Sequence, residues 1–228
     1  MIVYTSQYNE NKSDLLNLDL EPVMTSLKAK EGIDQYIKCY AAIEELKNTF
    51  LVRSDIELEL RFDSNGNIYT DRYGQRFYDT FINPQIDNKV FTLNYNHVFF
   101  SEQKLEIIQL PAFYHETPFD DDFYSVIGSF DISSWLRPLQ PGYINKNYNK
   151  EKSILIKRGD PLYYVKFNTK ENIKLKRFDI SSNMLAYIES CVGYKAFDKK
   201  SNLQKLYKVF SKHKYNKKIL KEIKNNLL

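Results

Sequence analysis

The sequence predicts an α+β protein whose core is a mainly antiparallel β-sandwich or jelly-roll, with an N-terminal helix and a C-terminal cluster of short helices. Apolar residues first recur every three or four positions, then alternate with polar residues through a long middle region, and return to helical spacing after Asp179. The predicted strands follow one another without intervening helices, a pattern typical of antiparallel sheets. An aromatic content of 15% provides side chains for a large core.

The first helical pattern lies near the N-terminus. Apolar residues spaced three and four apart, from Ile33 to Phe50, predict an amphipathic helix over residues 34–48. We expect residues 1–30 to be irregular, apart from one short helix near residues 25–30.

The clearest strand covers residues 55–62, where polar and apolar residues alternate strictly. Asn65 and Gly66 follow, a pair typical of tight β-hairpin turns, so residues 68–71 are expected to pair back onto this strand. Segments rich in Val, Ile, Tyr, Phe and Thr predict further strands at residues 90–100, 105–114, 123–131, 153–157, 162–168 and 173–178.

Helical spacing returns in the C-terminal part. Ser182 or Asn183 is a candidate cap for a helix that reaches residue 192, and Asn216 for the last helix. Leu203, Leu206, Tyr207 and Phe210 form the apolar stripe of a helix between them. Each stripe is too narrow to make a core alone. We therefore predict a β-rich domain over residues 1–180, which includes the N-terminal helix, and a basic helical segment over residues 181–228 packed on it.

Charge is unevenly distributed along the chain. Residues 195–228 contain eleven lysines against two acidic residues, a net charge of +9, whereas the whole chain carries +4. Such a basic end is typical of polyanion binding. The predicted polyanion ligands are Lys212, Lys214, Lys217, Lys218 and Lys221. The alternative is a solvated helical face, because bidentate phosphate contacts favour arginine and this segment contains no arginine.

Composition also bears on the compartment and on the cysteines. The start of the chain lacks a basic segment followed by an apolar one, so no secretory leader is expected. No run approaches the ~18 apolar residues of a membrane helix, and we expect a soluble cytoplasmic protein. Cys39 and Cys191 are too few for a disulfide framework or a four-ligand zinc site. Both are predicted to be buried, free thiols.

The signatures of common catalytic classes are missing. The sequence has no Walker-type phosphate loop, no Gly-rich dinucleotide fingerprint, no nucleophile elbow and no His-Glu-x-x-His motif. It therefore names no cofactor and assigns no reaction.

One cluster has the ligands of a divalent metal. Residues 114–122 place a histidine and several carboxylates between two predicted strands, and oxygen ligands with one imidazole suit Mn, Fe or Mg. The candidate metal ligands are His115, Glu116, Asp120 and Asp122. The alternative is a solvated acidic loop, because the compact His-x-Asp/Glu pairing of many jelly-roll oxygenases is absent.

A second cluster is a candidate anion site. Residues 130–142 contain the only tryptophan, an arginine close to it, and prolines that restrict the backbone. A guanidinium presents a planar fork to phosphate or carboxylate. The candidate anion ligands are Arg137, Ser134 and Trp135. The alternative is an arginine that stacks on an aromatic ring or pairs with a surface acid.

Three stretches share a pattern with a known family: residues 37–56 (IKCYAAIEELKNTFLVRSDI), 135–138 (WLRP) and 158–167 (RGDPLYYVKF). Together they resemble a family of uncharacterised proteins found mainly in tailed bacteriophages, including marine ones. In that family a Lys-Cys-Pro sequence opens a helix that runs into a strand, and here Tyr40 stands in place of the Pro. The resemblance covers residues 35–170. It implies a phage origin and transfers no activity.

A weaker resemblance involves Ser133, Ser134, Arg137 and Gly142. These residues are similar to the dUTPase and dCTP-deaminase fold, in which a Ser/Arg segment before a Pro-Gly turn precedes a pair of strands. This resemblance implies a nucleotide substrate. The Gly-rich substrate loop of that fold is absent here.

Two functional hypotheses follow. The first is an accessory bacteriophage protein that acts by binding rather than catalysis, in the cytoplasm of an infected bacterium or in the virion. Its partner would be a host or phage protein, with a weak nucleic-acid contact through residues 199–228 and no membrane contact. The alternative is a small-molecule enzyme, either nucleotide-directed through Arg137 and Ser134 or a divalent-metal-dependent jelly-roll enzyme that uses residues 114–122.

Overall fold

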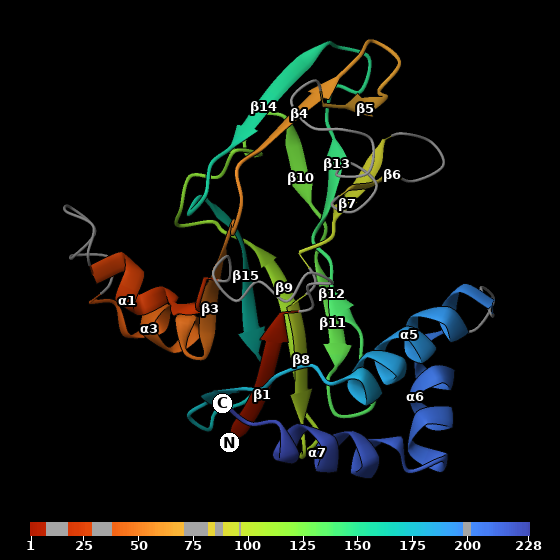
Figure 1. Ribbon diagram of the computed structural model, residues 1–228. Helices are drawn as coiled ribbons and strands as arrows, with labels where there is room; N and C mark the ends of the chain where they lie inside the picture. Colours follow the sequence, from red (N-terminus) through yellow and green to blue (C-terminus); the bar gives the residue numbers. More distant parts are fainter. Residues whose placement is uncertain (8–17, 29–37, 71–81, 85–88, 96, 198–201) are drawn as a thin grey trace.

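The structure is a computed structural model that describes residues 1–7, 18–28, 38–70, 82–84, 89–95, 97–197 and 202–228. It confirms an α+β fold that is mainly antiparallel β-sheet. Its helices are α1 (Val23–Lys28), α3 (Tyr40–Leu46), α5 (Ser182–Phe197), α6 (Leu203–Lys212) and α7 (Tyr215–Asn225). In Figure 1, α1 and α3 lie on one side of the strands, and α5 to α7 gather on the other side and below.

The described strands form four sheets. The first sheet has the order β12–β8–β1–β16, the second β10–β13–β7–β6, the third β11–β9–β15–β3–β2 and the fourth β14–β4–β5. Among the strands of the described residues, only β1 and β16 pair in parallel. The strands are β1 (Ile2–Gln7), β2 (Glu21–Pro22), β3 (Thr49–Arg53), β4 (Leu58–Phe62), β5 (Ile68–Tyr69), β6 (Ile82–Pro84), β7 (Val90–Leu93), β8 (His97–Ser101), β9 (Glu106–Pro111), β10 (Phe123–Ser125), β11 (Gly128–Asp131), β12 (Pro138–Leu139), β13 (Gly142–Asn145), β14 (Lys152–Ile156), β15 (Pro161–Phe167) and β16 (Lys174–Arg177).

The first sheet has a separate apolar cluster on each face. All five residues of β8 are buried, and their side chains alternate between the two faces. Phe99 belongs to the large cluster shared with the other three sheets. Val98 and Phe100 instead pack against the C-terminal helices. A strand that is buried on both faces reads as a nearly continuous apolar run.

The C-terminal helices are held on the first sheet by their apolar stripes. Leu206 and Phe210 of α6, and Ile219 and Ile223 of α7, are buried in one cluster with Tyr4 of β1. The chain end is fixed as well, since Phe178 and Leu227 form a β-bridge. These helices are therefore part of a shared core.

The predicted hairpin is confirmed. Phe62 pairs with Ile68 across the turn, and the Asp63 carboxylate accepts hydrogen bonds from the backbone N–H groups of Asn65 and Asn67, both at 2.8 Å. Gly66 has φ +78°, a left-handed conformation that glycine adopts without steric cost. The strand itself begins at Leu58, three residues later than predicted.

Several predicted boundaries are wrong. Residues 2–7 form the strand β1 rather than irregular chain. The predicted strand 90–100 is two strands, β7 and β8, that belong to different sheets, and the predicted strand 123–131 is likewise divided into β10 and β11. The predicted N-terminal helix lies partly outside the described residues; within them, α3 covers Tyr40–Leu46, and Phe50 belongs to β3.

The C-terminal helices were predicted more closely. Asn202 caps α6 by accepting from the Lys205 N–H at 2.9 Å. At the start of α5 the Ser181 hydroxyl accepts from the Met184 N–H at 3.2 Å, so the cap lies one residue before the expected Ser182. The N-cap of α7 is Lys214 rather than Asn216. No helix among the described residues is long and apolar enough to cross a membrane.

Candidate functional site

The helices α6 and α7 separate apolar and basic side chains. Their apolar sides are buried against the first sheet, and their lysines face solvent. We call the predicted polyanion ligands the lysine face: Lys212, Lys214, Lys217, Lys218 and Lys221. All five residues are exposed, and none has an ion pair within the described parts of the chain.

The backbone brings these lysines close to one another. Lys214 connects the two helices with φ +54°. Lys214, Lys218 and Lys221 follow at steps of four and three, which places them on the same side of α7. Like charges at this spacing repel. Lys218 lies over the Tyr215 ring at 5.5 Å, the one aromatic contact of this group among the residues that the structure describes. An anionic partner would relieve this repulsion.

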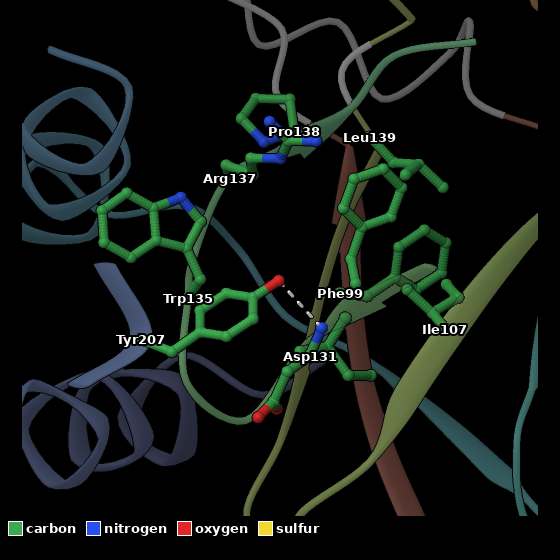
Figure 2. Close-up of a pocket in the computed structure, with 10 residues that line it drawn as sticks. Phe99, Ile107, Asp131, Trp135, Arg137, Pro138, Leu139 and Tyr207 are labelled. Atoms are coloured by element: carbon green, nitrogen blue, oxygen red, sulfur yellow. Dashed lines mark hydrogen bonds between the residues drawn. The ribbon is translucent and has the colours of Figure 1, made fainter. Parts of the chain in front are cut away.

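A second candidate lies where α6 meets the first and third sheets. Figure 2 shows Trp135, Arg137 and Tyr207 around one pocket, together with apolar side chains from the strands. The Arg137 guanidinium stacks on the Phe130 ring at 4.6 Å. No carboxylate or carbonyl among the described residues accepts a hydrogen bond from it. Burial lowers the pKa of Arg137, and the nearby Tyr207 has a smaller opposite effect; the guanidinium stays charged.

Two further donors line this pocket. The Tyr207 hydroxyl accepts from the Asp131 N–H at 3.1 Å, which leaves its own proton available. The indole N–H of Trp135 has no acceptor among the described residues. Ser134 does not line the pocket; its hydroxyl lies 3.3 Å from that of Ser133. The structure therefore brings together two of the three predicted anion ligands, and adds Tyr207, which lies 70 residues further along.

The pocket is small. Its interior volume is about 20 Å³, enough for a single water molecule. A whole nucleotide does not fit within it, so an anionic group would contact Arg137 from the pocket mouth. The unpaired guanidinium of Arg137 is consistent with the nucleotide-directed alternative, whereas the pocket is too small to hold a nucleotide.

The predicted metal ligands are separated in the structure. His115 is buried, with Nε2 2.9 Å from the Ser26 hydroxyl and Nδ1 2.6 Å from the Tyr164 hydroxyl. Both nitrogens are therefore occupied. The Asp120 carboxylate accepts from the backbone N–H and the hydroxyl of Thr117.

Asp122 is paired with Lys152 at 3.1 Å, and Glu116 is exposed. Among the described residues no three His, Cys, Asp or Glu side chains form a group that could hold a metal ion. The structure therefore gives the predicted metal site at residues 114–122 no assembled ligand group: His115 belongs to a buried hydrogen-bond network, Asp120 to a local turn and Asp122 to an ion pair.

The hydrogen-bond network of His115 includes residues that no sequence pattern indicates. Ser26 of α1 contacts His115 and also accepts from the Arg53 guanidinium at 3.1 Å. Arg53 pairs in turn with Glu21 at 2.9 Å. Ser26 and His115 are 89 residues apart in sequence, so no local motif links them. The network joins α1 to the third sheet.

One of the two cysteines differs from the prediction. Cys191 is buried and free, as expected, whereas Cys39 is free and exposed at the N-cap of α3.

Comparison of the chain with protein-family models, with curated proteins and with solved structures finds no match.

Proposed function

We propose that this chain is a binding protein that docks on a polyanion, a nucleic-acid backbone, through the lysine face of α6 and α7. The observation that supports this function is five exposed lysines without ion pairs in the described chain, on helices whose opposite sides are buried in a shared core. Their backbone positions are therefore fixed before a partner arrives, which reduces the entropy lost on binding.

Lysine is a point charge that contacts phosphates without reading bases. The proposed binding is accordingly independent of sequence and driven by release of counterions. The setting we propose follows the resemblance noted above: an accessory phage protein in the cytoplasm of an infected bacterium or in the virion, where host or phage proteins can join the same complex.

The test replaces Lys217, Lys218 and Lys221 together by Gln, which removes the charges, keeps polar side chains at these positions and leaves the buried stripe of α7 intact. Binding to a fluorescein-labelled duplex is measured by anisotropy over a salt series. Removing three phosphate contacts should reduce the slope of log K against log salt by roughly 3. Deleting the C-terminal segment is a poorer test, because Leu206, Phe210, Ile219 and Ile223 would leave the core.

A matched control makes the same charge change elsewhere. Lys150, Lys157 and Lys170 are also exposed, and their triple replacement by Gln should leave most of the salt slope unchanged. Equal losses in the two triple variants would reject the lysine face and indicate a general effect of net charge. Undiminished binding in the first variant would reject it too. If the wild type binds an acidic protein but not the duplex, the partner of the lysine face is a protein and the nucleic-acid proposal is rejected.

A second candidate function rests on the unpaired guanidinium of Arg137. It is recognition of a small carboxylate or phosphate at the mouth of the Trp135 pocket, the binding step of the small-molecule alternative. Trp135 is the only tryptophan, so its fluorescence reports directly on this site. Acetate or inorganic phosphate should change the emission saturably in the wild type and not in Arg137→Gln, with chloride at equal ionic strength as the control. A linear response, or the same response in both proteins, would reject this function.

A further inference from the structure

A cleft opens at the edge of the first sheet, where β1 ends. Its volume is about 320 Å³, which is within the range of small-molecule sites. Three neighbouring strands and the segment that leads into β2 provide its walls. Among the described residues, its lining includes the polar side chains of Thr5, Gln7 and His97 and the apolar side chains of Leu18, Leu20 and Leu175.

The strand register explains why polar side chains meet on one wall of the cleft. Gln7 of β1 is opposite His97 of β8, and Thr5 is opposite Arg177 of β16. Residues that are opposite in register, and residues two apart on one strand, point to the same face. Side chains from three adjacent strands are therefore presented side by side.

Two of these groups lack a partner. Nδ1 of His97 is buried and has no hydrogen bond. The Thr5 hydroxyl also has none among the described residues, although Thr5 is 8% exposed. Gln7, in contrast, donates to the Asp55 carboxylate and to the Tyr95 carbonyl. A buried polar group without a partner, as His97 Nδ1 is, is unfavourable. The Thr5 hydroxyl is not enclosed in this way and remains free to bond a ligand in the cleft.

The charge of the lining is balanced. Asp19 and Arg177, the charged side chains that line the cleft within the described part of the chain, pair with each other at 3.2 Å. Burial lowers the pKa of His97 to about 4, so its imidazole is neutral at pH 7. A neutral imidazole has one donor and one acceptor nitrogen, and a threonine hydroxyl likewise donates and accepts. Ligand hydroxyl groups match both, and the three leucines contact the carbon skeleton.

From this combination we propose that the cleft beside His97 and Thr5 binds a small uncharged polyhydroxylated molecule, of the size of a monosaccharide or cyclic polyol. This site lies on the opposite face of the first sheet from the C-terminal helices and is independent of the lysine face. Its occupant would satisfy His97 and Thr5 without disturbing the Asp19–Arg177 pair.

The test uses D-ribose, D-glucose and myo-inositol as probes, with saturation-transfer NMR to detect binding and titration to measure affinity. Thr5→Val replaces the unpartnered hydroxyl by a methyl group of similar size. Thr92→Val is the matched control, because the Thr92 hydroxyl is also buried without a partner and is outside the cleft. His97→Phe retains an aromatic ring and removes the nitrogens.

We expect at least one probe to bind the wild type saturably. Affinity should fall about tenfold in Thr5→Val and at least as much in His97→Phe, the loss expected for one hydrogen bond. It should change less than about twofold in Thr92→Val. Absence of saturable binding by all three probes up to about 50 mM would overturn the proposal. Equal effects of Thr5→Val and Thr92→Val, or tighter binding of acetate or phosphate than of the polyols, would overturn it as well.

Discussion

The ring of His115 lies between two hydroxyl groups, and its Nδ1 is 2.6 Å from the phenolic oxygen of Tyr164. Tyr164 and its neighbour Tyr163 point to opposite faces of β15. The Tyr163 hydroxyl is buried without a partner, whereas the Tyr164 hydroxyl also accepts from the Tyr114 N–H at 3.3 Å. Two adjacent tyrosines thus differ in whether their polar atom is satisfied.

This difference predicts opposite effects of the same substitution. Tyr164→Phe removes the partner of a buried imidazole and should lower the free energy of unfolding by about 1–3 kcal/mol. Tyr163→Phe removes an unsatisfied hydroxyl and should leave stability unchanged or raise it. Urea unfolding of the two variants measures this directly. Similar losses in both would contradict a specific contribution of the Tyr164 hydroxyl to stability.

A second matched pair concerns two glycines whose added Cβ would meet no atom within 4 Å. Gly159 has φ +91°, so an alanine there is strained despite the free space, and Gly159→Ala should destabilise by roughly 1 kcal/mol. Gly193 is in the helix α5, where alanine is preferred, so Gly193→Ala should stabilise by up to about 1 kcal/mol. Thermal unfolding of the two variants gives the signs; the same sign for both would contradict the backbone argument.

The two cysteines provide a third prediction. Cys39 is exposed and Cys191 is buried, and burial raises the pKa of the Cys191 thiol to about 11. Because the thiolate is the nucleophile, a short exposure to iodoacetamide at pH 8 should modify Cys39 alone. Peptide mass spectrometry identifies the modified residue. Modification of Cys191 at a similar rate in the folded protein would show that α5 opens readily.

Sequence patterns predicted what depends on neighbours in the chain. The Asn65–Gly66 turn was recoverable because its chemistry is local. The strand β1 was missed because its two partners, β8 and β16, are about 90 residues or more away. The β propensity of residues 90–100 predicts one strand, whereas the change of sheet between β7 and β8 is a tertiary feature.

The candidate sites follow the same rule. The sequence pointed to Arg137 because guanidinium chemistry is visible in one residue, and the lysine face because its charges are clustered in the chain. It could not show that both ring nitrogens of His115 are hydrogen-bonded, to Ser26 and Tyr164, since these three residues come from separate parts of the chain. Residue type indicates what a side chain can do, and distant partners decide whether it is available.

The last prediction concerns the dependence of stability on pH. His97 has its pKa lowered from 6.5 to about 4 by burial. Between these values the unfolded chain binds the proton and the folded chain does not, so stability is complete above pH 6.5 and falls as pH decreases toward 4. The loss should reach roughly 3 kcal/mol. Asp19 and Arg177 line the same cleft, and Asp55, whose pKa burial raises, acts in the opposite direction.

The measurement is therefore a difference between variants, which cancels the other groups. Urea unfolding from pH 4 to pH 7 should show a much flatter profile for His97→Phe than for the wild type. His213 is exposed, and His213→Gln should retain the wild-type profile. If the stability of His97→Phe falls with decreasing pH as steeply as that of the wild type, other groups cause the effect. The imidazole of His97 would then accept a proton in the folded protein, as it would in contact with water in the cleft.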